Sequence, residues 1–294
     1  MDELVSVIMS VYNETELELN ESINSILSQT YRNIEVLIVN DNPKNSDVRT
    51  YLKEFKDERI RIVENEKNIG LVKSLNKAIK LSNGNYIARM DADDVSMPDR
   101  VKIQMGYMKE KKLDLVGCCI EFIDERGRKL STQNFPEEQK KIQFFMKWGN
   151  CIPHPTWLVK KSLYEQLGWY REVKRCEDYD FICRAIQKKY RVGNVKQCLL
   201  KYRIRNNSIS NSNIGEQYIL RRYLAKQRKQ TVEMQRIEAY LMSSQYKEEV
   251  KKYNSFQKAK QHIKKFNGFF EMMKNKYCYI LLCEKIGLKI RNLI

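Results

Sequence analysis

Histidine is scarce in this sequence, with two among 294 residues, and no Cys-x-x-Cys occurs among its eight cysteines. These absences argue against a zinc site and against a disulfide framework. Scattered reduced thiols, several of them in the core, instead indicate a cytoplasmic protein. No apolar run approaches the ~20 residues that a membrane-spanning helix needs. Because acidic Asp2 and Glu3 stand where a signal peptide carries positive charge, we do not expect secretion.

Two familiar phosphate-binding motifs are also absent. No Gly-x-Gly-x-x-Gly follows the first apolar run, and no Gly-x-x-x-x-Gly-Lys-Ser/Thr occurs anywhere. A dinucleotide-dependent dehydrogenase and a P-loop enzyme would therefore lack their usual phosphate cradle. Any phosphate bound by this chain needs a different counter-charge.

Acidic residues are the minority, and the formal net charge is +17. Residues 215–294 hold 18 Lys and Arg against seven Asp and Glu, so most of the excess lies in the tail. This asymmetry predicts an anionic partner, either a lipid surface or nucleic acid, with a merely solvated basic face as the alternative.

The first ninety residues alternate between two hydrophobic periods. Short apolar runs predict buried strands over residues 4–11, 34–39, 60–63 and 86–90. Apolar faces at helical spacing lie between them, around Leu19 to Leu27 and Leu71 to Ile79. Strands that alternate with helices indicate right-handed βαβ units. We therefore expect an α/β fold with a Rossmann-like, mostly parallel sheet and helices on both faces.

The remaining sequence is less regular. It predicts a helix from Pro98, a strand over 115–123, a helix after Pro136 and a helix that starts at Asp178. From about Gly215 it is Lys-rich with apolar helical faces. We expect one domain over residues 1–214, with a nucleotide-binding half (1–97) and an acceptor half (98–214), and a basic helical C-terminal region over 215–294.

Polar residues follow each early strand, at the edge where open α/β sheets bind ligands. They are Tyr12 and Asn13, Asp41 and Asn42, Asn68 to Gly70, and Asp91 to Asp94. Asp91 and Asp93 are candidate ligands for Mg²⁺ or Mn²⁺, which favour one or two carboxylates plus phosphate oxygens. The alternative is that Asp91 to Asp94 cap the helix near Pro98. Like charges this close are costly without a counterion, which favours the cation.

An ordered set of motifs now becomes visible. It comprises Val5 to Asn13, Ile38 to Asp41, Asn68 to Leu71, Met90 to Asp94 with Pro98, Arg100 and Gln104, and Cys176 to Asp180. Across roughly residues 4–212 this set resembles an inverting family 2 glycosyltransferase of the GT-A fold. The resemblance implies transfer of a sugar from a nucleotide diphosphate, usually UDP, to an acceptor hydroxyl with inversion at the anomeric carbon.

The resemblance also implies donor-binding roles. Tyr12, with Asn13 beside it, would stack on the base, and Asp41 would accept a hydrogen bond from the base's imide N–H. Asp91 would bind the ribose or a metal-bound water, and Asp93 the metal. Tyr12 as an aromatic plug and Asp41 as a turn-former remain alternatives. Lys73, one turn into its helix, would reach the base or a phosphate, unless it is simply solvated.

On the acceptor side, Asp178 is our candidate general base, because inversion needs a carboxylate to take the acceptor's proton. Its alternative, like that of Glu177, is a helix cap. His154, between two prolines, is predicted near the diphosphate or acceptor, with a structural role as the alternative. The chain departs from the family where relatives have Tyr-Arg-x-His: it reads Tyr202-Arg-Ile-Arg205. Arg205, helped by Arg203, is predicted to clamp the diphosphate, with weaker metal dependence.

Family context predicts the setting. The acceptor would be a lipid-linked oligosaccharide of bacterial capsule, exopolysaccharide or O-antigen synthesis. The enzyme would sit at the inner face of the cytoplasmic membrane, held by its basic C-terminal region, notably residues 277–294, with no nucleic-acid partner. Oligomeric state stays open. Two alternatives are a metal-dependent nucleotidyltransferase, which leaves Asp178 without a role, and a non-catalytic module that binds an anionic polymer.

Overall fold

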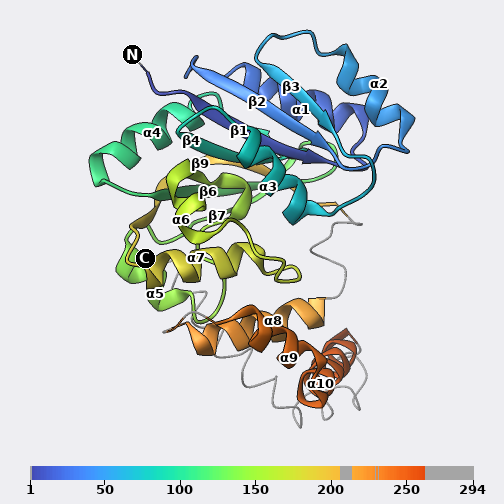
Figure 1. Cartoon of the computed structure of the whole chain (residues 1–294), viewed down its shortest axis with the longest axis vertical. Coiled ribbons are helices and arrows are strands. Elements are labelled where there is room, and N and C mark those ends of the chain that lie inside the picture. The colour runs from blue at the N-terminus through green and yellow to red at the C-terminus, as the bar shows by residue number, and fades with distance from the viewer. Residues whose placement is uncertain (1, 206–213, 229, 231, 262–294) are drawn as a thin grey trace.

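The protein is described here from a computed structural model that defines residues 2–205, 214–228, 230 and 232–261. Its strands form one sheet in the order β3-β2-β1-β4-β8-β6-β9-β5, with β7 paired to β6. Figure 1 shows this sheet above α7, with the last described helices below.

The N-terminal half consists of βαβ units, as the hydrophobic pattern predicts. Its strands are β1 (Val5–Val11), β2 (Ile34–Asn40), β3 (Ile60–Glu64) and β4 (Tyr86–Asp91), and its helices are α1 (Glu16–Leu27), α2 (Ser46–Glu54) and α3 (Leu71–Leu81). All pairings among these strands are parallel. Parallel pairing brings the carboxyl ends of β1, β2 and β4 to one edge of the sheet.

The second half closes the sheet with mixed pairing. Its strands are β5 (Val95–Ser96), β6 (Leu115–Ile123), β7 (Lys129–Gln133), β8 (Leu158–Lys160) and β9 (Val192–Arg203). Its helices are α4 (Arg100–Lys111), α5 (Gln139–Phe145), η1 (His154–Thr156), α6 (Lys161–Leu167) and α7 (Glu177–Gln187). β8 pairs antiparallel with β4 and β6, whereas β6 and β9 are parallel. The N-terminus of α7 thus comes from the half of the chain beyond β4.

The sheet is covered on both faces, which confirms the expected α/β arrangement. One core joins the sheet to α1, α2 and α4, through residues such as Leu19, Leu52 and Met105. The other joins it to α3, α6 and α7, with Leu75 and Tyr179 among its buried residues. Alternation along β4 sends Arg89 toward one face and Met90 toward the other.

The C-terminal helices α8 (Ile214–Gln227), α9 (Met234–Met242) and α10 (Ser244–Gln261) confirm the helical prediction for this part of the tail. Ile219 and Leu220 of α8 and Phe256 of α10 belong to the same core as α7. Within the described part of the chain, no helix has both the length and the hydrophobicity needed to cross a bilayer. The predicted membrane-binding segment 277–294 lies outside the described residues.

Candidate active site

The turn after β4 concentrates negative charge. One ligand atom from each of Asp91, Asp93 and Asp94 lies within 4.8 Å of the others. Asp94 is buried; its Oδ1 accepts a hydrogen bond from the Arg203 backbone N–H at 2.9 Å, and its Oδ2 has no hydrogen-bond partner. The helix-cap interpretation of these aspartates is wrong, because the N-cap residue of α4 is Asp99 and the Val101 N–H in its first turn donates to Gln29 Oε1 at 3.1 Å.

Arg205 neutralises part of this charge directly. Its Nε lies 2.8 Å from Asp93 Oδ2, its Nη1 lies 3.1 Å from Glu18 Oε2, and its Nη2 lies 3.8 Å from Glu14 Oε1. Burial and the nearby charge of Asp91 raise the pKa of Asp93 to about 7, although Arg205 opposes the rise. Arg205 therefore bridges the start of α1 to the turn after β4.

Arg203 is more completely enclosed. Its Nε donates to the Asp93 carbonyl at 2.8 Å, its Nη1 donates to the Glu125 carbonyl at 3.1 Å, and its Nη2 pairs with Glu21. The side chain is 3% exposed. These contacts fasten the end of β9 to the acidic turn.

The other donor-side residues lie at the ends of β1 and β2. Tyr12 exposes 43% of its surface, and the Asn13 Oδ1 accepts from Asn42 Nδ2 at 2.6 Å. Asp41, in contrast, is buried and accepts from the backbone N–H groups of Ile69 and Gly70, each at 2.8 Å. Asp41 thus fixes the loop that starts α3, where Gly70 has a φ of +86° that favours glycine.

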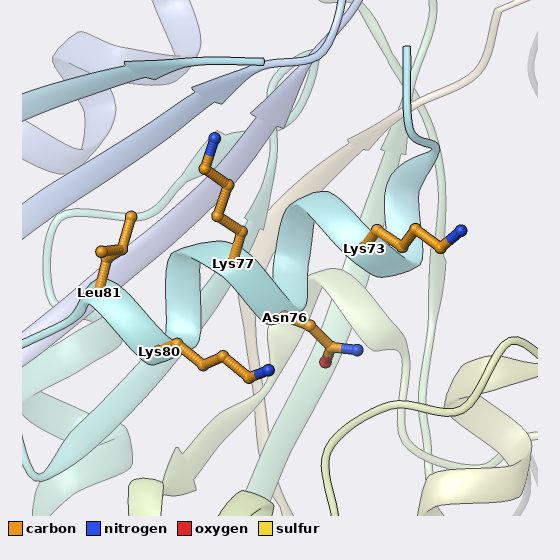
Figure 2. Close-up of a pocket in the computed structure, with 5 residues that line it drawn as sticks. All are labelled: Lys73, Asn76, Lys77, Lys80 and Leu81. Atoms are coloured by element: carbon orange, nitrogen blue, oxygen red, sulfur yellow. The ribbon is translucent and has the colours of Figure 1, made fainter. Parts of the chain in front are cut away.

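Lys73 is anchored on the outer flank of α3. Its Nζ lies 3.0 Å from Glu172 Oε1, with both side chains more than half exposed. Together with Asn76, Lys77, Lys80 and Leu81 it lines a pocket of about 470 Å³ (Figure 2). The acidic turn contributes nothing to this lining, so Lys73 is the one predicted site residue that borders it.

Asp178 stands in the first turn of α7. Its Oδ2 accepts a hydrogen bond from Asn150 Nδ2 at 2.6 Å, and its Oδ1 accepts from the Tyr179 backbone N–H at 2.6 Å. Burial raises the pKa of Asp178 above its usual value, while these hydrogen bonds and the charge of Arg89 hold it down. A carboxylate with a raised pKa is a stronger base than a solvated one.

Glu177 is the more perturbed neighbour. Burial and the charge of Asp178 raise the pKa of Glu177 to about 7. The residue before it, Cys176, occupies the N-cap position, and its own side chain makes no capping hydrogen bond. Glu177 and Asp178 are therefore not both fully ionised at neutral pH.

His154 is enclosed by aromatic residues. It is 8% exposed, its Nε2 lies 2.8 Å from the hydroxyl of Tyr170, and that hydroxyl lies 2.9 Å from the hydroxyl of Tyr164. Burial, with a contribution from Arg89, lowers the pKa of His154 well below its usual value, so the ring is neutral at pH 7. A neutral, hydrogen-bonded ring supports the structural alternative.

Arg89 lies between the donor side and the base side. Its Nη2 lies 2.5 Å from Asp91 Oδ1, and its positive charge lowers the pKa values of both Glu177 and Asp178. Asp91 in turn raises the pKa of Glu177, so the carboxylates after β4 and those of α7 share one electrostatic neighbourhood. This electrostatic interaction supports the prediction that the carboxylates after β4 and those of α7 face a common site.

Sequence reasoning missed Arg89, Asn150, Glu14 just before α1 and Glu18 in its first turn. Arg89 had a signal, since a residue two positions before Asp91 on a strand shares its face. The glutamates follow β1 directly, but their partner Arg205 lies about 190 residues away along the chain. Asn150 stands in a loop without periodicity, and its contact with Asp178 is set by tertiary packing alone.

A twisted α/β sheet with a carboxylate-lined C-terminal edge beside a half-buried candidate base describes a class of group-transfer enzymes. Residues 6–168 match the family model Glycosyl transferase family 2. The chain belongs to this family and is a glycosyltransferase. The nucleotidyltransferase and binding-module alternatives are accordingly set aside.

Relatives support the same assignment. The chain is 38% identical over 229 residues to the uncharacterized glycosyltransferase MJ1057 of Methanocaldococcus jannaschii, covering 76% of this chain and 78% of that one. It is 34% identical over 233 residues to the O-antigen biosynthesis glycosyltransferase WbnJ of Escherichia coli, covering 76% and 90%. A crystal structure of S. aureus TarS in complex with UDP-GlcNAc superposes with a TM-score of 0.63 at 19% identity, covering 79% and 69%. That similarity confirms the expected GT-A fold.

The raised pKa of Glu177 leads to a stability prediction. A buried carboxyl group whose pKa is raised favours the folded state at low pH, and this contribution is lost as the pH rises through the folded value of about 7. Glu177→Gln keeps the shape without the charge. We expect it to be near neutral at pH 5 and to stabilise by up to about 3 kcal/mol at pH 8. Thermal unfolding at both pH values measures this, and an equal Tm difference at each would contradict it.

Proposed function

We propose that the protein catalyses inverting transfer of a sugar from a UDP-sugar to an acceptor hydroxyl, with Asp178 as general base. The observation that carries this proposal is the setting of Asp178: half-buried at the start of α7, oriented by Asn150, and under the electrostatic influence of Arg89, which pairs with Asp91. The acceptor hydroxyl would lose its proton to Asp178 as its oxygen attacks the anomeric carbon. The bond from that carbon to the diphosphate breaks on the opposite side.

Asn150 prepares Asp178 for this role. Its Nδ2 donates to Asp178 Oδ2, while its own Oδ1 accepts from the Ile152 backbone N–H at 3.0 Å. The amide is therefore fixed at both ends, which fixes the carboxylate rotamer. A base held in one orientation contributes to the ~10²- to 10⁴-fold of general-base catalysis.

The residues after β4 fit a divalent cation. Three carboxylates meet within 4.8 Å, and the buried Asp94 Oδ2 has no donor of its own. Mn²⁺ or Mg²⁺ would be held by Asp93 and Asp91, and when bound would supply positive charge for the leaving diphosphate. Arg205, already on Asp93, would add a second positive charge and clamp the diphosphate, which reduces the dependence on metal.

The exposed Tyr12 ring at the end of β1 supports a stacking role on the uracil base. Asn13 and Asp41 border the same edge, and we keep Asp41 as the imide acceptor and Asp91 as the ribose or metal-water ligand. Donor binding by UDP-sugar draws support from the fold shared with TarS, which was crystallised with UDP-GlcNAc.

Four further predicted residues receive narrower roles. Lys73 would approach a phosphate only by leaving Glu172, and Arg203 holds β9 to the acidic turn. Glu177 tunes the charge beside the base, and His154 supports the acceptor side through Tyr170.

The acceptor is proposed to be a lipid-linked oligosaccharide in surface-polysaccharide synthesis, such as capsule or exopolysaccharide. Two relatives are named for such pathways, WbnJ for O-antigen and AmsE of Erwinia amylovora for amylovoran biosynthesis. The chain would work at the inner face of the cytoplasmic membrane, attracted by the basic region 215–294. Each Lys or Arg near an anionic leaflet contributes ~1 kcal/mol.

Asp178→Asn tests the base. Transfer from a panel of UDP- and GDP-sugars, measured as nucleoside diphosphate release with and without acceptor, first identifies the wild-type donor. The variant should then lose at least ~10²-fold in kcat, because asparagine cannot take the proton, while calorimetric UDP affinity changes less than about threefold. Lost UDP affinity with normal turnover would instead make Asp178 a binding residue. Absence of transfer from every donor would count against the function itself.

Asp93→Ala tests the cation. It should abolish the gain in UDP affinity that Mn²⁺ confers, because it removes a carboxylate ligand. Arg205→His, which replaces a counter-charge with a ligand, should increase that gain. Asp99→Ala, which alters an exposed aspartate bonded to Thr30, is the matched control. Unchanged calorimetric affinity with and without Mn²⁺ in all these proteins would contradict the metal role.

Membrane attraction is tested by co-sedimentation with vesicles. Removing residues 215–294 would take away the core contacts of α8, so the truncation should follow Gln261. The full chain should bind anionic vesicles more tightly than neutral ones, and the truncated chain should lose part of this preference because it loses basic side chains. Equal binding to both vesicle types would rule the electrostatic attachment out.

A further inference from the structure

Arg89 is a buried cation with unsatisfied hydrogen-bonding groups. It is 3% exposed, in a strand that lies between β1 and β8. Its Nη2 pairs with Asp91, but its Nε and Nη1 have no hydrogen-bond partner among the described residues. Burying a guanidinium with unpaired donors is unfavourable. An apolar side chain would fill this position at a lower free-energy cost, so the charge of Arg89 needs a functional reason.

The surroundings of Arg89 supply that reason. The face of β4 that carries Arg89 is covered by the aromatic cluster of His154, Tyr164 and Tyr170 and by the start of α7. These aromatic groups stay neutral, because burial lowers the pKa of His154 and raises those of the two tyrosines. The negative groups that interact electrostatically with Arg89 are the carboxylates after β4 and those of α7.

We propose that Arg89 is a positioning residue for the transfer reaction: one buried guanidinium holds Asp91 on the donor side and lies on the face of β4 that shares a core with α7, the helix that carries Asp178 on the acceptor side. This inference rests on the proposed function, since it assigns Asp178 the role of base. Arg89 does not touch the substrates. It acts by keeping Asp91 oriented and by favouring the ionised form of Asp178.

Several groups affect the pKa of Asp178, and the test must separate their effects. The charged and titratable groups around it are Glu177 and Cys183 of α7, the N-cap residue Cys176 and Arg89 of β4; Asp91 acts on Glu177, and Arg221 of α8 acts on Cys176. Asp180, on the same helix, is already paired with Arg171 and Arg184. Among the groups that act on Asp178 itself, Arg89 is the cation that favours its ionised form.

The sign of the expected change follows directly. Removing a cation that favours the carboxylate raises the pKa of Asp178, so a higher pH is needed to ionise the base. The acidic limb of the pH profile of kcat/KM should therefore move to higher pH in Arg89→Gln. Arg89→Lys keeps the charge and should keep the limb near its wild-type position, although it fits Asp91 less well.

The experiment compares wild type, Arg89→Gln, Arg89→Lys and the control Arg100→Gln. Arg100 is an equally buried arginine, but its guanidinium donates to the carbonyls of Pro155 and Arg89. We expect Arg89→Gln to lose about 100-fold in kcat/KM with the acidic limb raised by at least about 0.5 pH unit. Arg89→Lys should recover most of both, and Arg100→Gln should lower Tm without moving the limb.

Two results would overturn the inference: an unmoved limb in Arg89→Gln, or Arg89→Lys no better than Arg89→Gln at equal Tm. If Arg89→Gln does not fold, a comparison of Arg89→Lys with Arg89→Met still shows whether the charge or the packing of this side chain matters. UDP affinity gives a second readout, because Arg89→Gln and Asp91→Asn should be non-additive if the arginine acts through Asp91. Failure of the wild type to transfer any sugar would refute the proposed function instead, so the two failures are distinguishable.

Discussion

Compensation of clustered negative charge is the constraint on which this site depends. The carboxylates after β1 and β4 would repel one another strongly in a partly buried setting. Three arginines offset part of this repulsion: Arg89 from within the sheet, and Arg203 and Arg205 from the end of β9. Because β9 returns to the turn after β4, the basic end of the domain is fastened to its acidic edge. The negative charge of the site is therefore only partly compensated before any substrate binds, because the carboxylates outnumber the arginines.

The charged residues of this site form two groups, one on a face of β4 and one beyond the end of that strand. Arg89 and Asp91 face the core shared with α3, α6 and α7, where the start of α7 presents Asp178. Asp93, beyond the strand, instead meets Arg205 beside the glutamates that begin α1. A donor diphosphate at this edge would lie between the two sets of charges.

The C-terminal helices belong to the same structure as the site. α8 packs on the α7 core, and Arg221 Nη1 donates to the Trp148 carbonyl, two residues from the Asn150 that orients Asp178. Stacking of Tyr218 on Tyr253 and of Tyr223 on Tyr240 joins α8 to α10 and α9. The described C-terminal helices are thus packed against the part of the chain that orients Asp178.

The sequence by itself determined the local elements and the residue types at the sheet edge. The spacing of apolar residues predicted β1 to β4, α1, α3 and the start of α7, because alternation and helical spacing are properties of residues close together in the sequence. It missed the three-residue β8 and the Lys-bearing β9, whose strands form only against their partners. Tertiary structure alone decided that Arg205 reaches Asp93 and that Asn150 reaches Asp178. Those contacts join segments far apart in the chain, and only the packed sheet brings them within hydrogen-bonding distance.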